Sequence, residues 1–228
     1  MAYFKTDNPI TKGETVALVG PEHHHAKDVR RIFVGESVHI LNNKTIAEGI
    51  VEAIEGERTI VRVLHIFPQE QIHDISLVVG VVKRQALEEI VRHATELGVA
   101  KLVLFHADHS PLSFPEIPER LIRIAEEACK QADRPTPPSI VLASSLEEIL
   151  TEQSAGSIIV GSKYAPKTVS TPLAEPILLV VGPEGGLSKR EEELLRNARA
   201  QHVTLSAFTL RTPTAALALL SFANSLLK

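Results

Sequence analysis

The stretch Pro176-Ile-Leu-Leu-Val-Val-Gly-Pro-Glu-Gly-Gly-Leu-Ser188 predicts a strand, a bare turn and a helix in immediate succession. Ile177 to Val181 is an unbroken apolar run, as expected of a strand that is covered on both faces. The turn after it holds three glycines and a proline, so its main-chain groups can approach a ligand closely. Ser188 and Glu191 have the spacing of a capping box, which predicts the start of a helix. This order places main-chain donors at the carboxyl edge of a sheet, where open α/β folds bind ligands.

The turn differs from the loops that bind nucleotides. It contains neither Gly-x-Gly-x-x-Gly nor Gly-Lys-Ser/Thr, and Glu184 inside it would repel a phosphate. A neutral or cationic ligand therefore fits better. The spacing alone is equally compatible with a glycine-rich connection that binds nothing.

A second segment favours a ligand site. Val181-Gly-Pro-Glu-Gly-Gly-Leu-Ser188, followed further along by Thr209-Leu-Arg-Thr-Pro-Thr-Ala-Ala216, resembles the RsmE family of SPOUT methyltransferases. Members of that family methylate N3 of a uridine in bacterial small-subunit (16S) ribosomal RNA, using S-adenosylmethionine. The resemblance extends along essentially the whole chain. It implies the same activity, the same methyl donor and the same RNA partner here.

The resemblance also implies which residues bind the methyl donor, largely through their main chain. They are Val181, Gly182, Pro183, Glu184, Gly185, Gly186, Gly161, Leu205, Leu210, Arg211, Thr212 and Ala215. Arg211 is the one catalytic candidate, because a cation there could stabilise negative charge that develops on the uracil oxygens. We expect neither a metal nor a nucleophilic residue, and no side chain stands out as a general base.

Two positions depart from the family pattern. Most relatives carry an acidic residue or alanine where this chain has Pro213, and His109 replaces the usual arginine. We expect the last helix to keep its start, with Thr212 as N-cap and Pro213 at the first helical position. The departures leave an alternative, a non-catalytic RNA-binding homologue that has lost or changed methyl transfer. A dinucleotide-dependent oxidoreductase is disfavoured, since Val82-Lys-Arg-Gln85 offers no glycine fingerprint.

The composition is that of an ordinary globular chain, with 228 residues, 44% hydrophobic and 23% charged. No apolar run approaches the roughly 20 residues that a membrane span requires, and Met1 to Lys5 lacks a signal-peptide core. We therefore expect a cytoplasmic protein, with its single cysteine, Cys129, in the core. Because the formal charge is −4, RNA contacts must come from local basic clusters.

The first expected domain spans residues 1–70. Short β-rich stretches at 15–19, 38–41, 45–53 and 59–66 and a helix over 21–32 are spaced as in a small barrel. Consecutive histidines 23–25 would point in different directions, which makes them poor joint metal ligands. His25-Ala-Lys-Asp-Val-Arg-Arg-Ile-Phe-Val-Gly35 is similar to the opening of the family's PUA-like RNA-binding domain. The expected RNA contacts are His25, Arg30, Arg31, Lys83, Arg84 and Arg134.

The second expected domain spans residues 73–228, after a linker at 67–74. Six strands at 75–82, 101–105, 140–142, 157–161, 177–181 and 202–205 alternate with helices at 85–98, 116–132, 146–151, after Ser188 and over 215–227. This alternation predicts a mostly parallel sheet, and periodicity alone indicates a doubly wound one. The resemblance instead implies an α/β SPOUT domain with a C-terminal trefoil knot, preceded by the β-rich PUA-like domain. The last helix is apolar on nearly every face, and we expect it to pack in a homodimer.

Overall fold

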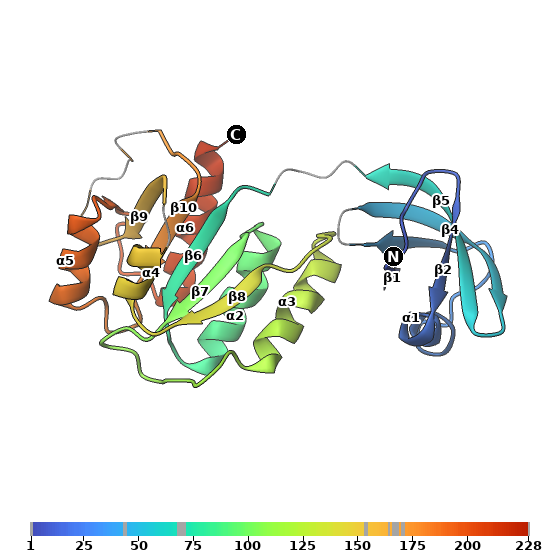
Figure 1. Cartoon of the computed structure of the whole chain (residues 1–228), viewed down its shortest axis with the longest axis horizontal. Coiled ribbons are helices and arrows are strands. Elements are labelled where there is room, and N and C mark those ends of the chain that lie inside the picture. The colour runs from blue at the N-terminus through green and yellow to red at the C-terminus, as the bar shows by residue number, and fades with distance from the viewer. Residues whose placement is uncertain are drawn as a thin grey trace. The chain divides into compact units, whose positions relative to one another are not determined.

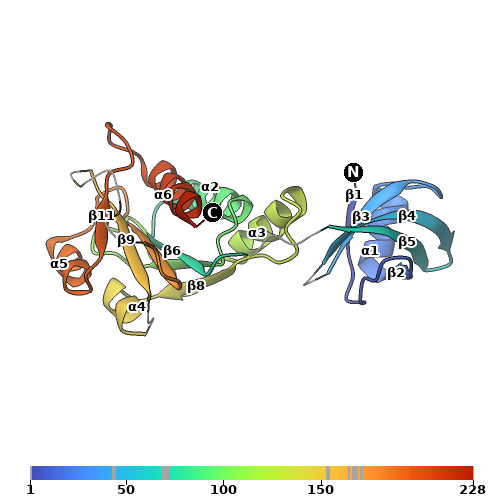
Figure 2. The same ribbon diagram turned by 90° about the horizontal axis from the view of Figure 1, so that it is seen from above.

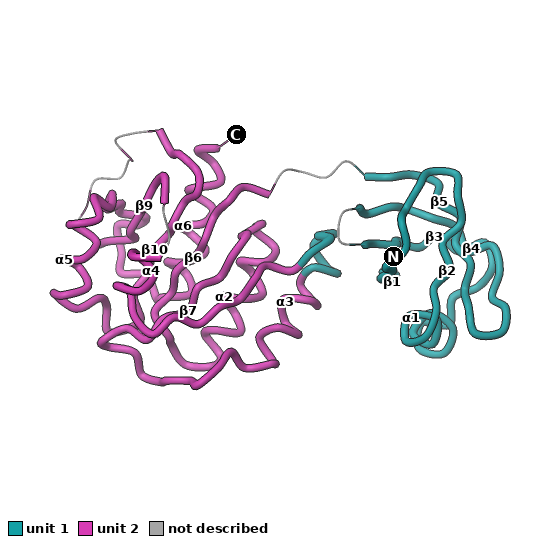
Figure 3. The backbone as a smooth tube through the Cα atoms, viewed as in Figure 1, with its two compact units in different colours: residues 1–71, 129–136 teal, residues 72–128, 137–228 magenta. Residues whose placement is uncertain are grey.

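The computed structural model describes residues 2–42, 45–67, 72–152, 155–163, 165, 169 and 172–227. The chain divides into two compact units, one of residues 1–71 with 129–136 and one of residues 72–128 with 137–228 (Figure 3). Each unit contains a sheet and a core of its own. Residues 68–71, which the expected linker includes, lie outside the described residues.

The first unit is built on a five-stranded sheet in the order β1-β3-β4-β5-β2. Its strands are β1 (Ala2–Lys5), β2 (Thr15–Val19), β3 (Ser37–Leu41), β4 (Ile46–Glu55) and β5 (Arg58–Phe67). β1 pairs with β3 in parallel, and the other pairs are antiparallel. The side chains on the inner face form one core around Phe4, Leu18, Ile40 and Val61. Four of these strands were predicted, whereas β1 is too short to show an alternating pattern.

The helix expected over residues 21–32 is shorter than predicted. α1 (Gly20–His24) continues into a single π-helical turn, η1 (His25–Val29), and the helical path then ends. Arg31 takes a left-handed backbone conformation, with φ of 53°, which a helix does not accommodate. The three histidines diverge as expected: His23 is buried beside Thr59, His24 is exposed beside Asp28, and His25 contacts the ring of Phe4.

The second unit is built on a six-stranded sheet in the order β11-β9-β10-β6-β7-β8 (Figure 1). The strands are β6 (Ile75–Gly80), β7 (Lys101–Phe105), β8 (Ser139–Ala143), β9 (Ser157–Gly161), β10 (Ile177–Val181) and β11 (Gln201–Val203). Every neighbouring pair is parallel, which confirms the predicted mostly parallel sheet. Two strands end earlier than predicted, because Val81 and Val82 lie beyond β6, and Thr204 and Leu205 lie beyond β11.

Helices cover both faces of this sheet. They are α2 (Arg84–Glu96), α3 (Glu119–Gln131), α4 (Leu146–Glu152), α5 (Lys189–Asn197) and α6 (Thr212–Leu226). One apolar cluster joins the sheet to α2, α3 and α6, and a second joins its other face to α4 and α5. Figure 2 shows α2 and α6 on one side of the sheet and α4 on the other. Within the described ranges, none of the helices combines the length and the apolar surface that crossing a bilayer requires.

Candidate active site

The turn after β10 has the tight geometry that its glycines predict. All five residues of β10 are buried between β9 and β6, so the chain leaves the sheet at its centre. The N–H of Gly186 donates to the carbonyl oxygen of Pro183 at 2.8 Å. A Cβ atom at Gly182 would lie 2.9 Å from the Leu187 nitrogen, and Gly186 has φ of +75°. Both positions therefore require glycine.

The turn packs against the ends of two other strands. A Cβ atom at Gly80, the last residue of β6, would lie 2.6 Å from Cδ of Pro183. A Cβ atom at Gly185 would lie 2.9 Å from Cβ of His109, which follows β7. The carboxyl ends of β6, β7 and β10 thus meet at one place, and small residues allow their main chains to approach.

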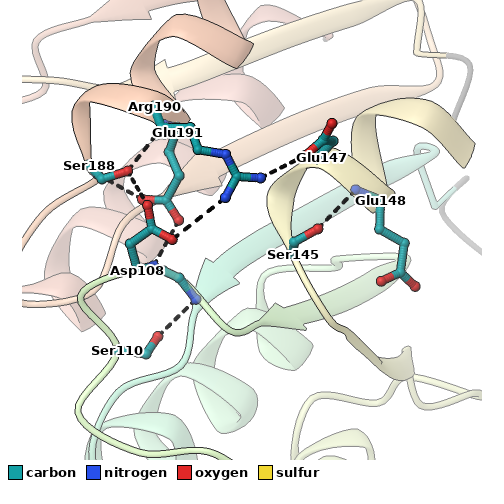
Figure 4. Close-up of polar contacts among 9 residues, drawn as sticks. Asp108, Ser110, Ser145, Glu147, Glu148, Ser188, Arg190 and Glu191 are labelled. Carbon is teal, nitrogen blue, oxygen red and sulfur yellow. Dashed lines mark hydrogen bonds and ion pairs between the residues drawn. The ribbon is translucent and has the colours of Figure 1, made fainter.

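The predicted capping box at the start of α5 is confirmed (Figure 4). The N–H of Glu191 donates to Oγ of Ser188 at 3.2 Å, and the N–H of Ser188 donates to Oε2 of Glu191 at 2.7 Å. The side chain of Glu191 reaches further than a cap, because its Oε1 also accepts from the N–H of Asp108 at 3.0 Å. Glu191 is only 3% exposed. A buried carboxylate therefore joins α5 to the loop after β7.

Further contacts hold this loop against the start of α5 and the turn, and Figure 4 shows those of Asp108, Ser188 and Arg190. The hydroxyl of Ser188 donates to Oδ2 of Asp108 at 2.5 Å, and Nδ1 of His109 donates to the carbonyl oxygen of Gly186 at 3.2 Å. The Arg190 guanidinium lies 2.7 Å from a carboxylate oxygen of Glu147 and 4.0 Å from one of Asp108. His109, the residue that departs from the family pattern, thus has a structural contact with the turn. In the sequence, only the spacing of Ser188 and Glu191 predicted any part of this network.

The second signature segment reaches the same turn through Thr212. Its hydroxyl donates to the carbonyl oxygen of Gly182 at 3.2 Å. The expectation that Thr212 caps α6 is wrong: the helix begins at Thr212, its N-cap is Arg211, and no side chain caps it. The hydroxyl is directed to Gly182 instead. Pro213 is buried in the first helical turn, where the missing N–H would have had no helical partner.

A cavity of about 110 Å³ lies between the segments that follow β9 and β11. Gly161, Ser162, Lys163, Leu205, Ser206, Phe208, Thr209, Leu210 and Ala215 line it. The two segments are tied together, since the hydroxyl of Thr204 donates to the carbonyl oxygen of Ser162 at 3.0 Å. The cavity walls combine main chain and small polar or aliphatic side chains with one aromatic side chain, Phe208, and one cation, Lys163.

The structure brings together only part of the expected donor-binding set. Of that set, four residues line the cavity: Gly161, Leu205, Leu210 and Ala215. The turn from Gly182 to Gly186 adjoins this region through the Thr212 bond but does not line the cavity, and neither do Arg211 and Thr212. Val181 is close, since a Cβ at Gly161 would lie 3.9 Å from its Cγ2. Ser162, Lys163, Ser206, Phe208 and Thr209 are lining residues that the sequence did not single out.

The expected RNA contacts differ in accessibility. Arg30 and Arg31 are exposed in the first unit, and Lys83 and Arg84 are exposed at the start of α2. His25 is half-buried. Arg134 is only 7% exposed, and its Nε donates to the carbonyl oxygen of Thr136 at 2.6 Å. Burial lowers the pKa of the Arg134 guanidinium from its ordinary value, although an arginine stays charged at neutral pH after such a shift.

The part of the chain that the structure describes shows no cluster of metal ligands. Among the described residues, no three His, Cys, Asp or Glu side chains are grouped so that they could hold a metal ion. Cys129 lies in α3 and is 1% exposed, as expected of a core residue. The cavity at this edge therefore offers main chain, hydroxyls, aliphatic side chains, Lys163 and Phe208 as binding groups.

Comparison with known proteins shows the class of protein to which this chain belongs. A family model described as RNA methyltransferase domain matches residues 68–224, the part of the chain that holds the parallel sheet, the glycine turn and the cavity. The Ribosomal RNA small subunit methyltransferase E of Aquifex aeolicus (strain VF5) is 39% identical over 155 residues, which make up 65% of this chain and 67% of that protein. This chain belongs to the RsmE family of ribosomal RNA small-subunit methyltransferases.

Two further relatives cover nearly the whole chain. The protein of the same name from Bacillus subtilis (strain 168) is 26% identical over 245 residues, covering 98% of this chain and 96% of that protein. The crystal structure of Ribosomal RNA small subunit methyltransferase E from Neisseria gonorrhoeae bound to S-adenosyl methionine has a TM-score of 0.84 and 24% identity, covering 99% of this chain and 98% of that one. The likeness to this structure shows that both units share its fold.

Proposed function

We propose that this chain transfers the methyl group of S-adenosylmethionine to N3 of a uridine in 16S ribosomal RNA. The observation that carries the proposal is the meeting of the two signature segments. Thr212 of the second segment binds Gly182 of the first, and the cavity opens beside them at the carboxyl edge of the sheet. Ligands of open α/β folds bind at this edge. Membership of the RsmE family supports the same function.

The cavity suits the methyl donor chemically. S-adenosylmethionine supplies an electrophilic methyl group on a sulfonium, so the site needs to bind and orient it rather than activate it. Among the described residues, neither a carboxylate nor a phosphate-binding loop lines the cavity, and Leu205, Leu210 and Ala215 offer apolar walls to an uncharged moiety. Typical ligand pockets hold about 300–1,000 Å³. A cavity of about 110 Å³ therefore encloses one moiety of the donor, and we propose that the turn from Gly182 to Gly186 contacts another.

Positioning accounts for much of the catalysis that such a site can provide. Holding the uracil N3 about 3 Å from the methyl carbon replaces a bimolecular encounter by a unimolecular step. Arg211 is exposed at the N-cap of α6, and in our proposal its guanidinium stabilises negative charge on the uracil oxygens as N3 loses its proton. An Arg211→Ala variant that kept full turnover and unchanged donor affinity would remove Arg211 from this role.

We also propose finer features of architecture that the family resemblance implies. The segment after β11 forms a trefoil knot, and the first unit is a PUA-like RNA-binding domain. Support for the second role comes from the small five-stranded sheet and from the exposed side chains of Arg30 and Arg31. His25, Lys83, Arg84 and Arg134 complete the proposed RNA contacts, with Arg134 the least accessible of them. The proposed compartment is the cytoplasm, where ribosomal subunits are available.

The proposed assembly is a homodimer through α6. One face of this helix is buried in its own unit, including Ala216, Leu219, Leu220 and Ala223. Leu226 remains 48% exposed on the same helix, and Leu217 and Phe222 are only partly buried. A second copy that packed on α6 would cover this remaining apolar surface.

Labelled methyl transfer tests the proposed function. Small ribosomal subunits and naked 16S RNA from a strain that lacks the modification are incubated with the protein and S-adenosylmethionine labelled in its methyl group. The labelled nucleoside is then isolated and identified. We expect label in 3-methyluridine. RNA binding without any transfer would favour the alternative, a non-catalytic RNA-binding homologue, and label in another nucleoside would refute the assignment to uridine N3.

A further inference from the structure

Phe208 stands out from the other apolar side chains of the second unit. It lies in the loop between β11 and α6 and is 82% exposed, the largest exposed fraction among the large apolar side chains that the described residues leave at the surface. Its N–H donates to Oγ of Ser206 at 3.1 Å, so the loop makes a local turn at this point. Single exposed apolar residues are common on proteins, so exposure alone assigns no role.

The location of Phe208 distinguishes it from other exposed apolar residues. The residue lines the same cavity as Gly161, Leu210 and Ala215, yet most of its surface remains open to solvent. Within the described part of the chain, the ring–ring contacts all lie in the first unit, so Phe208 stacks on no other ring there. A free aromatic face therefore stands at the rim of the proposed donor site.

The chemistry of the rim favours a nucleobase as the ligand of this face. Proteins that read single-stranded RNA commonly stack its unpaired bases on aromatic side chains. The lining residues that the structure describes include Lys163 and no acidic side chain, so this part of the rim does not repel a phosphate backbone. The adenine of the donor is the other flat group at such a site. A ring that is 82% exposed has most of its surface in solvent outside the cavity, where an RNA base can reach it.

We propose that Phe208 is a positioning residue that stacks on the target uracil at the rim of the cavity between the segments after β9 and β11. This inference rests on the proposed function and deepens it. The stacked ring orients the base, while the enclosed residues hold the donor. Phe208 thus contributes to the selection of an unpaired, accessible uridine.

Kinetics separate this role from a role in donor binding. In Phe208→Ala, KM for unmodified small subunits rises about tenfold, within the range that alanine substitution gives for base–aromatic stacking. The affinity for S-adenosylmethionine, measured by calorimetry, stays at the wild-type value. Phe208→Tyr retains a stacking ring and restores the KM. Ile122→Ala, a matched control on α3 that is 44% exposed, leaves both quantities unchanged. An unchanged KM for RNA, or a matching loss of donor affinity, overturns the proposal.

Fluorescence gives a readout that does not depend on turnover. The chain contains no tryptophan, so Phe208→Trp places its only tryptophan at the rim. A single-stranded oligouridylate quenches this tryptophan, and S-adenosylmethionine alone does not. The same oligonucleotide leaves Ile122→Trp unquenched. Quenching by the donor alone, or equal quenching of both variants, contradicts stacking on the base.

Two further outcomes are distinguishable. If Phe208→Ala changes the molecular mass in solution, measured by light scattering, the ring belongs to a contact between copies of the chain and the proposal is wrong. If the wild-type protein transfers no methyl group, the proposed function fails. The tryptophan variant then still decides whether the rim binds a base.

Discussion

Glu191 is a single residue that connects two parts of the site. Its two carboxylate oxygens accept from the N–H groups of Ser188 and Asp108, so one side chain satisfies a donor at the start of α5 and a donor in the loop after β7. The side chain is almost fully buried, which means that water cannot replace either bond. Glu191 is therefore a structural residue on which the shape of the glycine turn depends.

Replacing Glu191 tests this assignment. Glu191→Gln keeps the shape of the side chain but turns one acceptor into a donor that faces an N–H group. A buried donor that loses its partner costs about 1–3 kcal/mol. We expect the urea midpoint of unfolding of the second unit to fall in Glu191→Gln and to stay unchanged in Glu193→Gln, a matched exposed position on α5. Equal midpoints for the two variants would contradict the structural role.

The sequence predicted residues whose partners are local and missed those whose partners are distant. The capping box of Ser188 and Glu191 spans three residues, so its spacing is visible in the chain. Thr212 was expected to cap α6 because threonine before proline commonly does so. Its actual partner, Gly182, is 30 residues away. No local pattern could reveal that the fold directs this hydroxyl to the turn after β10.

Between elements, the bond from Thr212 joins the end of β10 to the start of α6. We expect Thr212→Val, which loses the hydroxyl and keeps the volume, to weaken the binding of S-adenosylmethionine by about two- to tenfold, because a hydrogen bond contributes about 0.5–1.5 kcal/mol. Thr212→Ser keeps the hydroxyl and restores affinity. Calorimetry measures both variants. Wild-type affinity in Thr212→Val would show that the two segments bind the donor independently.

The opposite edge of the sheet has a pH-dependent contact. The N–H of Asp74 and then His73 lower the pKa of Glu175 from its ordinary value, and Nδ1 of His73 lies 2.7 Å from its Oε1. A lowered pKa in the folded state means that the contact stabilises the protein above the ordinary pKa of glutamate and is lost as the pH falls through the folded-state value. The contact joins the chain before β6 to the chain before β10.

The consequence is a pH-dependent effect of Glu175→Gln. We expect this variant to unfold at a lower temperature than the wild type at pH 7. The difference should shrink as the pH is lowered towards about pH 3, because the wild-type carboxylate takes up a proton as the pH falls through its folded-state pKa. Thermal unfolding followed by circular dichroism at the two pH values checks this. A difference of equal size at both would show that the charge of Glu175 does not contribute.

The sequence predicted the elements of the second unit better than those of the first. Buried strands alternating with amphipathic helices give a strong pattern, and the six strands and five helices were placed within a few residues of their ends. In the first unit β1 has only four residues and gains its stability from pairing with β3, which its own sequence does not show. The helix over 21–32 was predicted too long, because the left-handed turn at Arg31 is set by the surrounding fold.

For the whole molecule, the sequence predicted a parallel sheet but not its strand order. The order β11-β9-β10-β6-β7-β8 decides that the cavity lies between the segments after β9 and β11. The glycine turn, which is the most conspicuous motif in the sequence, lies beside this cavity rather than in its wall. Residues such as Phe208 and Lys163 therefore became visible only once the strand order was known.

In our proposal the first unit binds RNA and the second binds the methyl donor, so a substitution in one unit should affect only one of the two affinities. In our proposal Arg30 contacts RNA phosphate, so Arg30→Gln should weaken the binding of 16S RNA and lower the salt dependence of the logarithm of the binding constant by about 0.7–0.9. Donor affinity should stay unchanged. Arg58→Gln, a matched exposed arginine at the start of β5, should leave both quantities at their wild-type values. Identical salt dependence in Arg30→Gln and the wild type would remove Arg30 from the interface.

The binding of S-adenosylmethionine to a cavity-filled variant tests the central claim, that the methyl donor binds between the segments after β9 and β11. Ala215 lines the cavity, and the neighbouring Thr214 is exposed and does not. Calorimetric titration of the wild type, Ala215→Phe and Thr214→Phe, each first shown to be folded by circular dichroism, compares the two positions. We expect one donor per wild-type chain, the same affinity in Thr214→Phe, and a loss of at least about tenfold in Ala215→Phe. Wild-type affinity in Ala215→Phe would contradict the claim.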